Sequence, residues 1–185
     1  MNKSIIETPL MTKDYLQEYQ YAGPIVTGAI ALYDSHGEVL YEKIFRMGTG
    51  IPGAPRALAV SDTGIVAVIT GSGEDPESEN ILHVYRRSGV EILAYPEKKG
   101  EEVHPMEIQG MSSNGRYLAV KAGFPFPEFP KTVFFDLEKN AFWKADRNYF
   151  WFKEITDDGM VKASYKDQIA NKTIKTEIDL SRGRE

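Results

Sequence analysis

One glycine-rich segment of this sequence matches a motif that binds dinucleotides. Residues 48–53 read Gly-Thr-Gly-Ile-Pro-Gly, which fits the spacing Gly-x-Gly-x-x-Gly. The motif holds a pyrophosphate only where its glycines open a helix whose N-terminus faces the anion. Here Pro52 and Pro55 lead into the strand-like residues 57–60, Ala-Leu-Ala-Val, instead of a helix. We therefore interpret residues 48–53 as a loop between repeats and expect no cofactor.

Ser112 lies in a segment that comes within one residue of the nucleophile elbow of α/β-hydrolases. Residues 110–114 read Gly-Met-Ser-Ser-Asn, whereas the elbow requires Gly-x-Ser-x-Gly. The elbow joins a strand to a helix, but this segment has strand-like residues on both sides, so we interpret Ser112 as a turn residue. The histidines, His36, His83 and His104, are too scattered to indicate a catalytic triad or a metal site.

Two sets of acidic residues could support chemistry. Residues 74–79, Glu-Asp-Pro-Glu-Ser-Glu, offer carboxylate oxygens of the kind that bind calcium, but they lack the ordered spacing of an EF-hand loop. We interpret them as the solvated tip of a hairpin and expect no metal site. Asp62, Asp157 and Asp158 could line a central channel in a hydrolase or lyase, although each lies in a turn whose backbone chemistry already favours aspartate.

The most unusual segment is rich in phenylalanine and proline, and we predict a binding surface there. Residues 124–130 read Phe-Pro-Phe-Pro-Glu-Phe-Pro, so prolines stiffen a loop whose rings must either fold back onto the protein or face solvent. Exposed apolar patches often mark binding surfaces, and rigid aromatic side chains are favoured anchors. The alternative is a plug within the core. A second aromatic cluster follows, and the predicted contact residues are Phe124, Phe126, Phe129, Phe142, Trp143 and Trp151.

The overall composition is that of a small globular protein built from strands and turns. Its 185 residues fit one domain with a sizeable core. The 11% aromatic residues, 16 glycines and 10 prolines favour strands and turns over helices. A formal charge of −5 argues against a nucleic-acid partner, because such binding depends on clustered lysine and arginine. The absence of cysteine excludes disulfides and thiolate chemistry.

The sequence also bears on where the protein works. Glu7, Lys13 and Asp14 interrupt the start of the chain before any apolar run reaches the length of a signal-peptide core. No segment approaches the roughly 20 apolar residues that span a bilayer. We therefore expect a cytoplasmic protein without a membrane span, or a periplasmic or extracellular protein if the sequence is a processed fragment.

An internal repeat is the strongest signal in the chain. Its first element is an apolar residue, Ser or Thr, two variable or acidic residues and then Gly, followed by a strand-like run. Each copy is predicted to be a hairpin turn, because Asp and Asn side chains bond nearby amides and Gly tolerates the positive φ of a tight reversal. The copies are residues 60–64 (Val-Ser-Asp-Thr-Gly), 111–115 (Met-Ser-Ser-Asn-Gly) and 155–159 (Ile-Thr-Asp-Asp-Gly).

A second element follows each copy and consists of an apolar strand, a turn and usually another strand. An additional version stands first in the chain, where residues 29–34 turn at Ser35-His36-Gly37 into residues 38–41. The chain therefore contains about three and a half units of roughly 45 to 50 residues, the size of one four-stranded propeller blade. The later versions begin with residues 81–85, 132–136 and 176–180.

These two elements resemble a known repeat family. Residues 112–120, Ser-Ser-Asn-Gly-Arg-Tyr-Leu-Ala-Val, resemble the Ser-Pro-Asp-Gly turn and following strand of TolB-type, YVTN-type and related WD-like propellers. Residues 30–34 with Gly37 resemble the outer hairpin of those proteins. The resemblance covers roughly residues 28–181, and every copy lacks the turn proline. It implies an all-β fold, a β-propeller-like array of four-stranded antiparallel blades, and it says little about activity.

The half unit leaves the closure of the array open. We divide the chain into an N-terminal segment, residues 1–27, and a repeat domain, residues 28–185. The segment could supply missing inner strands, with residues 24–27 as one candidate, and complete a four-unit ring. Two chains could instead form one larger propeller, or the array could stay open with its edges blunted or covered. Residues 12–19 are predicted to form a short helix capped by Thr12.

The sequence leads to two functional hypotheses. The first is a non-enzymatic propeller-like module that acts through protein–protein contacts or self-association as a homodimer, with the Phe-Pro loop and the neighbouring aromatic cluster as its contact surface. The second is a propeller-type hydrolase or lyase that uses acidic residues in a central channel. An enzyme requires titratable groups that converge on one pocket, whereas a binding module presents an exposed aromatic surface.

Overall fold

The fold is all-β, as the sequence predicts. The computed structural model describes residues 2–6, 15–21, 27–46, 55–71, 80–96, 104–123, 130–145, 150–167 and 169–182. These residues form fifteen strands in four antiparallel sheets and contain no helix. Across this described part of the chain, no helix is therefore long and apolar enough to cross a membrane.

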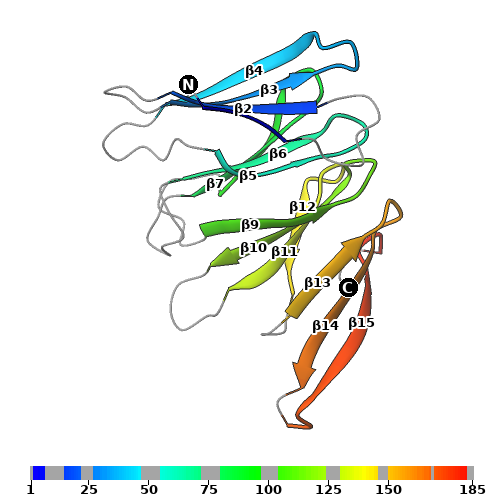
Figure 1. Cartoon of the computed structure of the whole chain (residues 1–185). Coiled ribbons are helices and arrows are strands. Elements are labelled where there is room, and N and C mark those ends of the chain that lie inside the picture. The colour runs from blue at the N-terminus through cyan, green and yellow to red at the C-terminus, as the bar shows by residue number, and fades with distance from the viewer. Residues whose placement is uncertain are drawn as a thin grey trace.

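Each sheet is formed by strands that follow one another in the chain (Figure 1). The first sheet consists of β1 (Asn2–Ile6), β2 (Tyr15–Tyr21), β3 (Thr27–Tyr33) and β4 (Val39–Arg46). The second consists of β5 (Pro55–Val60), β6 (Val66–Thr70), β7 (Ile81–Tyr85) and β8 (Glu91–Tyr95). The third consists of β9 (His104–Met111), β10 (Tyr117–Gly123), β11 (Lys131–Asp136) and β12 (Ala141–Lys144). The last sheet consists of β13 (Phe150–Ile155), β14 (Met160–Asp167) and β15 (Lys172–Asp179).

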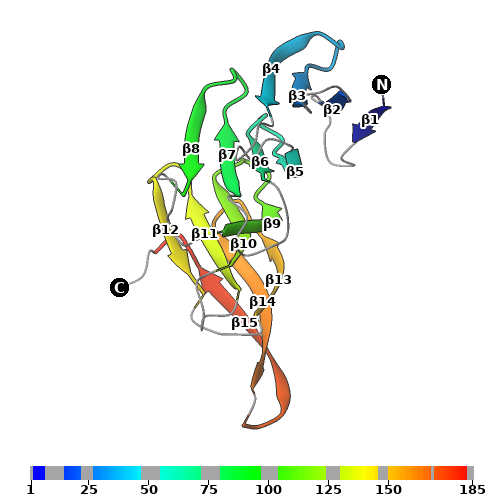
Figure 2. The ribbon, with the colours of Figure 1, turned by 90° about the vertical axis from the view of Figure 1, so that its left-hand side faces the viewer.

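The four sheets are stacked in chain order like successive blades. Figures 1 and 2 show the first sheet at one end of the stack and the last sheet at the other. The described residues therefore form an open series of propeller-like blades in this structure. Among the described residues, both outer sheets consequently have one face that no other sheet covers.

The core is formed where the faces of neighbouring sheets meet. Val66 and Val68 of β6 pack towards the first sheet, in one cluster with Ile30 and Leu32. The alternate residues of β6, Ala67 and Ile69, pack towards the third sheet. A strand buried on both faces is expected to be apolar throughout rather than alternating, and all five residues of β6 are buried. β10 behaves in the same way, with alternate residues in two different clusters.

The predicted hairpin turns are confirmed. Gly64, Gly115 and Gly159 have φ values of 79°, 74° and 87°, in the left-handed region that glycine favours. In the third sheet, Ser112 Oγ accepts a hydrogen bond from the Tyr117 amide at 2.9 Å and donates one to Asn114 Oδ1 at 2.8 Å. Ser112 is therefore a buried turn residue, as its sequence context indicates.

The repeated turns also bond to one another across sheet boundaries. The Asp62 amide donates to the Ser113 carbonyl at 2.8 Å, which joins the turn of the second sheet to that of the third. The Asn114 amide donates to Asp157 Oδ1 at 2.8 Å, and Asn114 Nδ2 donates to the Asp157 carbonyl at 3.1 Å. The same short motif thus makes its own hairpin and aligns the next blade.

A buried carboxylate holds the two hairpins of the third sheet together. Asp136, only 1% exposed, accepts hydrogen bonds from Arg116 Nε at 3.2 Å and Nη2 at 3.0 Å. It also accepts bonds from the amides of Glu138 and Lys139. Burial opposes ionisation, but these hydrogen bonds outweigh it and hold the pKa of Asp136 below its usual value.

The structure corrects the prediction for the N-terminal segment. Residues 15–19, predicted to be helical, lie in strand β2, which pairs with β1 and β3 along its length. Pairing with β1 and β3 gives the backbone of β2 hydrogen-bond partners on both sides, whereas a short isolated helix is only marginally stable in water. The tyrosines at 15, 19 and 21 also favour a strand. Residues 1–27 thus contribute β1 and β2 to the first sheet, while 24–26 of the candidate strand 24–27 lie outside the described residues and Thr27 begins β3.

Candidate binding surface on the last sheet

The last sheet has one face against the third sheet and one face turned outward. On β14, Val161 and Ala163 belong to the core cluster shared with the third sheet. The alternate residues of the strand, Lys162 and Ser164, therefore point to the opposite face. The register places Trp151, Ser164 and Lys175 in one cross-strand row of this outward face. We call it the outward face, defined by Trp151, Lys153, Glu154, Lys162, Ser164, Lys166, Lys175 and Glu177.

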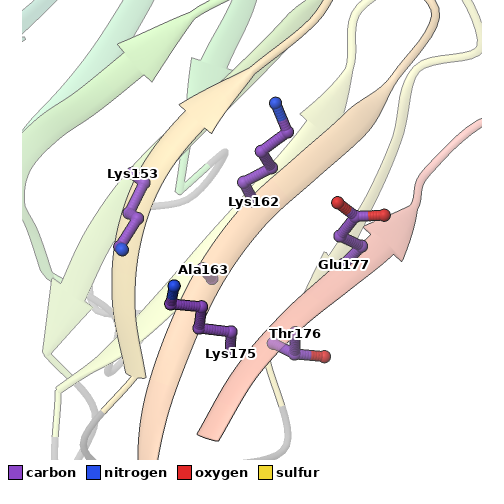
Figure 3. A pocket seen from close by; sticks show the side chains of 6 residues that line it. All are labelled: Lys153, Lys162, Ala163, Lys175, Thr176 and Glu177. Carbon is purple, nitrogen blue, oxygen red and sulfur yellow. The ribbon is translucent and has the colours of Figure 1, made fainter.

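A hollow of about 530 Å³ lies on this sheet (Figure 3). Figure 3 shows lysine side chains from all three strands around it. Three lysines face one glutamate, so the hollow is locally positive in a chain whose formal charge is −5. Its lining residues are Lys153, Lys162, Ala163, Lys175, Thr176 and Glu177.

The lysines of the hollow differ in their ionic environment. Lys162 Nζ donates to Glu154 Oε1 at 2.5 Å, and both side chains are about half exposed. This hydrogen bond and the charge of Glu154 raise the pKa of Lys162. Lys153 and Lys175 have no ion-pair partner among the residues that the structure describes. Their charges are available to an anionic partner.

Trp151 is the one large apolar side chain of β13 that points away from the core. It is 45% exposed, whereas Phe150 and Phe152 on either side pack against the cluster between the third and last sheets. Alternation along the strand explains the difference, because successive side chains point to opposite faces. The outward face therefore combines an aromatic anchor with a positive hollow.

The structure separates the aromatic residues that the sequence groups together. Phe142 and Trp143 are neighbours on β12 and point to opposite faces. Phe142, 54% exposed, lies with its ring centroid 5.2 Å from that of Tyr95 in the second sheet. Trp143 is half-buried on the opposite side, against the last sheet. Trp151 belongs to the outward face, so these three do not form one patch.

Several predicted segments lie outside the described residues. They include the loop with Phe124, Phe126 and Phe129, the glycine-rich residues 48–53 and the acidic residues 74–79. Within the described ranges, no group of three or more acidic or histidine side chains could hold a metal ion.

The acidic residues proposed for a channel take part in turns. Asp157 bonds to the turn of the third sheet, as described above. Asp158 accepts a hydrogen bond from the Thr156 hydroxyl, which lowers the pKa of Asp158. Both are exposed, and so is Asp62.

His83 belongs to a polar cluster that the sequence did not indicate. Its Nδ1 lies 2.6 Å from Glu91 Oε1, and its ring stacks on Tyr85 at a centroid distance of 6.1 Å. Burial, followed by the charge of Glu91, raises the pKa of Tyr85. His83 and Tyr85 lie two residues apart on β7, and the pairing of β7 with β8 places Glu91 opposite Tyr85. Phe45 of β4 covers the His83 ring from the first sheet, so the cluster joins two blades.

The lysines of the hollow were also missed by sequence reasoning. Lys162 and Lys175 are 13 positions apart in the chain. Only the register of β14 with β15 makes them diagonal neighbours on one face, because Lys162 pairs with Glu177 and Lys175 pairs with Ser164. The available signal was the charged alternation of residues 160–167 and 172–179, which contrasts with the apolar strands of the inner sheets.

Comparison with known proteins gives no family for this chain. No protein-family model matches, and no curated protein matches. Among solved structures, two mutant forms of the apocarotenoid oxygenase of Synechocystis are similar to this chain, and each match covers 90% of it. Their sequence identities are 10% and 11%, and their TM-scores are 0.34 and 0.33. The chain spans 55% of the length of each. These values are too low to carry an argument about function.

Proposed function

We propose that this protein is a propeller-like binding module that docks an acidic protein segment on the outward face of its last sheet. The observation that carries the proposal is Trp151, 45% exposed beside a lysine-lined hollow. Tryptophan is among the residues that most often dominate binding energy at protein interfaces. The inner blades bury both their faces and serve as the scaffold.

The charge of the hollow determines the chemistry of the partner. Lys153 and Lys175 attract carboxylates, and an apolar side chain between those carboxylates would cover the Trp151 ring. An extended segment of the pattern Glu-x-Leu-x-Glu meets both requirements, because an extended chain presents every second side chain, here Glu, Leu and Glu, to one side. Charge complementarity of this kind speeds association and selects against basic partners.

A defined pair of peptides tests the proposal. The probe is a synthetic peptide that repeats Glu-Ser-Leu-Ser, which places Glu and Leu in turn on one side of the extended chain, and its control is the same peptide with Lys in place of Glu. Binding is followed by the fluorescence of Trp151 in a Trp143→Phe background. We expect the acidic peptide to bind, the basic peptide not to bind, and the affinity to fall as salt is added, because exposed charges are screened.

Two variants separate the anchor from the charge. Trp151→Ala, followed by calorimetry, is expected to weaken binding by roughly 30-fold, the effect of losing a contact of about 2 kcal/mol. Lys153→Glu is expected to weaken it by roughly three- to tenfold at low salt. Arg86→Glu, in an exposed turn of the second sheet, is the matched control and should leave affinity unchanged. Equal binding by Trp151→Ala and the native chain, or no binding of the acidic peptide, would overturn the proposal.

A further inference from the structure

The third strand of the last sheet has an open edge where the other sheets have a further strand. β3, β7 and β11 are each flanked on both sides, whereas β15 pairs with β14 alone among the described residues. Strand β15 is eight residues long. Every second residue of such an edge directs its backbone N–H and C=O groups away from the sheet, where they can accept another strand.

The charges on β15 are arranged so that the strand is complementary to itself. Lys175 and Glu177 flank Thr176 and lie on the outward face. In an antiparallel pair centred on Thr176, Lys175 of one copy stands opposite Glu177 of the second copy, and the two-fold symmetry repeats the pair. Opposite charges directly across a pair of strands are stabilising, and like charges are destabilising.

The other face of β15 is also complementary in this register. Ile174 stands opposite Ile178 of the second copy, twice, and Thr176 faces its own symmetry mate. β-branched residues are favoured in such cross-strand pairs. On the outward face, Thr173 stands opposite Asp179 of the second copy, so no like charges face each other between residues 173 and 179.

Neighbouring registers lack this complementarity. Centring the pair on Lys175 places two lysines against each other, and centring it on Glu177 places two glutamates against each other. A slip of this kind keeps the same faces together but changes every cross-strand partner. The charge pattern therefore selects the register centred on Thr176.

We infer that two copies of this chain associate through antiparallel pairing of their β15 edges in the register centred on Thr176, which joins the two last sheets into one continuous sheet. The pairing is isologous, since the same strand serves on both sides of a two-fold axis. It goes beyond the proposed function, because docking of an acidic segment near Trp151 does not require a second copy. In the dimer Lys175 faces Glu177 of the second copy, and Lys153 still faces the acidic segment. A single pair of edges buries little surface, so the dimer depends on protein concentration.

Charge exchange between Lys175 and Glu177 gives the decisive experiment. Sedimentation of the native chain over a concentration series should show reversible association to twice the chain mass of 20.8 kDa. K175E and E177K each place like charges in both symmetric pairs and should raise the dimer dissociation constant roughly tenfold or more. The doubly exchanged chain, K175E/E177K, restores opposite charges and should dimerise like the native chain.

Mixing the two single variants tests the register itself. The K175E strand carries two negative charges and the E177K strand two positive charges at the paired positions. An equimolar mixture should therefore form a heterodimer, although each variant alone is largely monomeric. A surface elsewhere on the protein would not produce this rescue, and a monomeric mixture would overturn the inference.

The absence of cysteine from the chain allows a second measurement. T176C places its thiol on the two-fold axis, directly opposite its own mate at a Cβ separation of about 4.5–5.5 Å. I174C lies on the same face, but its mate is displaced by four residues, about 13 Å. T176C should form a disulfide-linked dimer under mild oxidation, and I174C should not.

The outcomes distinguish this inference from the proposed function. Native chain that stays monomeric at every concentration, or equal cross-linking of T176C and I174C, would overturn the pairing and leave peptide docking unaffected. A dimer that binds no acidic peptide would overturn the docking proposal alone.

Discussion

Replacement of Gly115 by alanine should loosen the junction between the second and third sheets. Gly115 has a φ of 74°, which an L-residue adopts only with strain. A Cβ atom there would lie 2.6 Å from Ile65 Cγ1 and 2.7 Å from Ser61 Oγ, both in the neighbouring blade. The substitution therefore strains its own turn and pushes against the turn stacked on it.

The size of the effect follows from these two contributions. The left-handed backbone conformation costs about 1–2 kcal/mol for alanine, and overpacking of a tight site costs about 1–3 kcal/mol. Gly115→Ala should thus lower the free energy of unfolding by about 2–5 kcal/mol. For a chain of this length the melting temperature should fall by roughly 4–20 °C, at roughly 2–4 °C per kcal/mol.

Urea and thermal unfolding, followed by circular dichroism, measure the change. Gly123→Ala is the matched control. Gly123 is also buried, at the end of β10, but it lacks a positive φ. The nearest contact of an added Cβ atom would be Met106 Sδ at 3.5 Å. The control should change stability by less than about 1 kcal/mol. Equal losses for Gly115→Ala and Gly123→Ala, or no loss for either, would refute the reasoning.

Two further predictions concern a buried charge and the tryptophans. Hydrogen bonds from Arg116 hold the pKa of Asp136 below its usual 3.8 despite burial. The ionised Asp136 therefore stabilises the folded protein above about pH 4, and this contribution is lost as the pH falls through the folded-state pKa. Asp136→Asn should cost about 1.5–3 kcal/mol at neutral pH and flatten the acid dependence of urea unfolding; unchanged acid dependence would contradict this. Trp143→Ala should lower the free energy of unfolding by about 2 kcal/mol, because Trp143 packs against the core. Trp151→Ala should change the urea midpoint little, because Trp151 is exposed. Equal losses of stability in the two variants would contradict the inward position of Trp143 and the outward position of Trp151.

Local sequence chemistry was sufficient to predict the turns and most strands. Asn114 and Gly115 specify a tight reversal wherever they stand, because the amide side chain bonds the Arg116 amide, at 2.9 Å, and glycine accepts the positive φ. Strands 66–70 and 117–123 were predictable from β-branched and aromatic runs. These features depend on residues close in sequence, so no knowledge of the fold is needed.

The N-terminal segment was not predictable in the same way. Residues 15–19 fit a helix as well as a strand, and the outcome depends on β1 and β3, which offer hydrogen bonds on both sides of β2. Partners distant in sequence override a weak local preference whenever they satisfy the backbone more completely. The prediction of a helix was therefore wrong for a tertiary reason.

The candidate surface shows the same division. The sequence by itself determined that the chain is all-β, that it repeats a blade-sized unit and that Trp151 lies in an aromatic cluster. Only the tertiary structure decided that Trp151 faces outward while Trp143 packs inward, and that Lys153, Lys162 and Lys175 meet at one hollow. The physical reason is strand register, because the pairing of β13, β14 and β15 sets which side chains are neighbours across the sheet, and a single sequence does not encode that pairing locally.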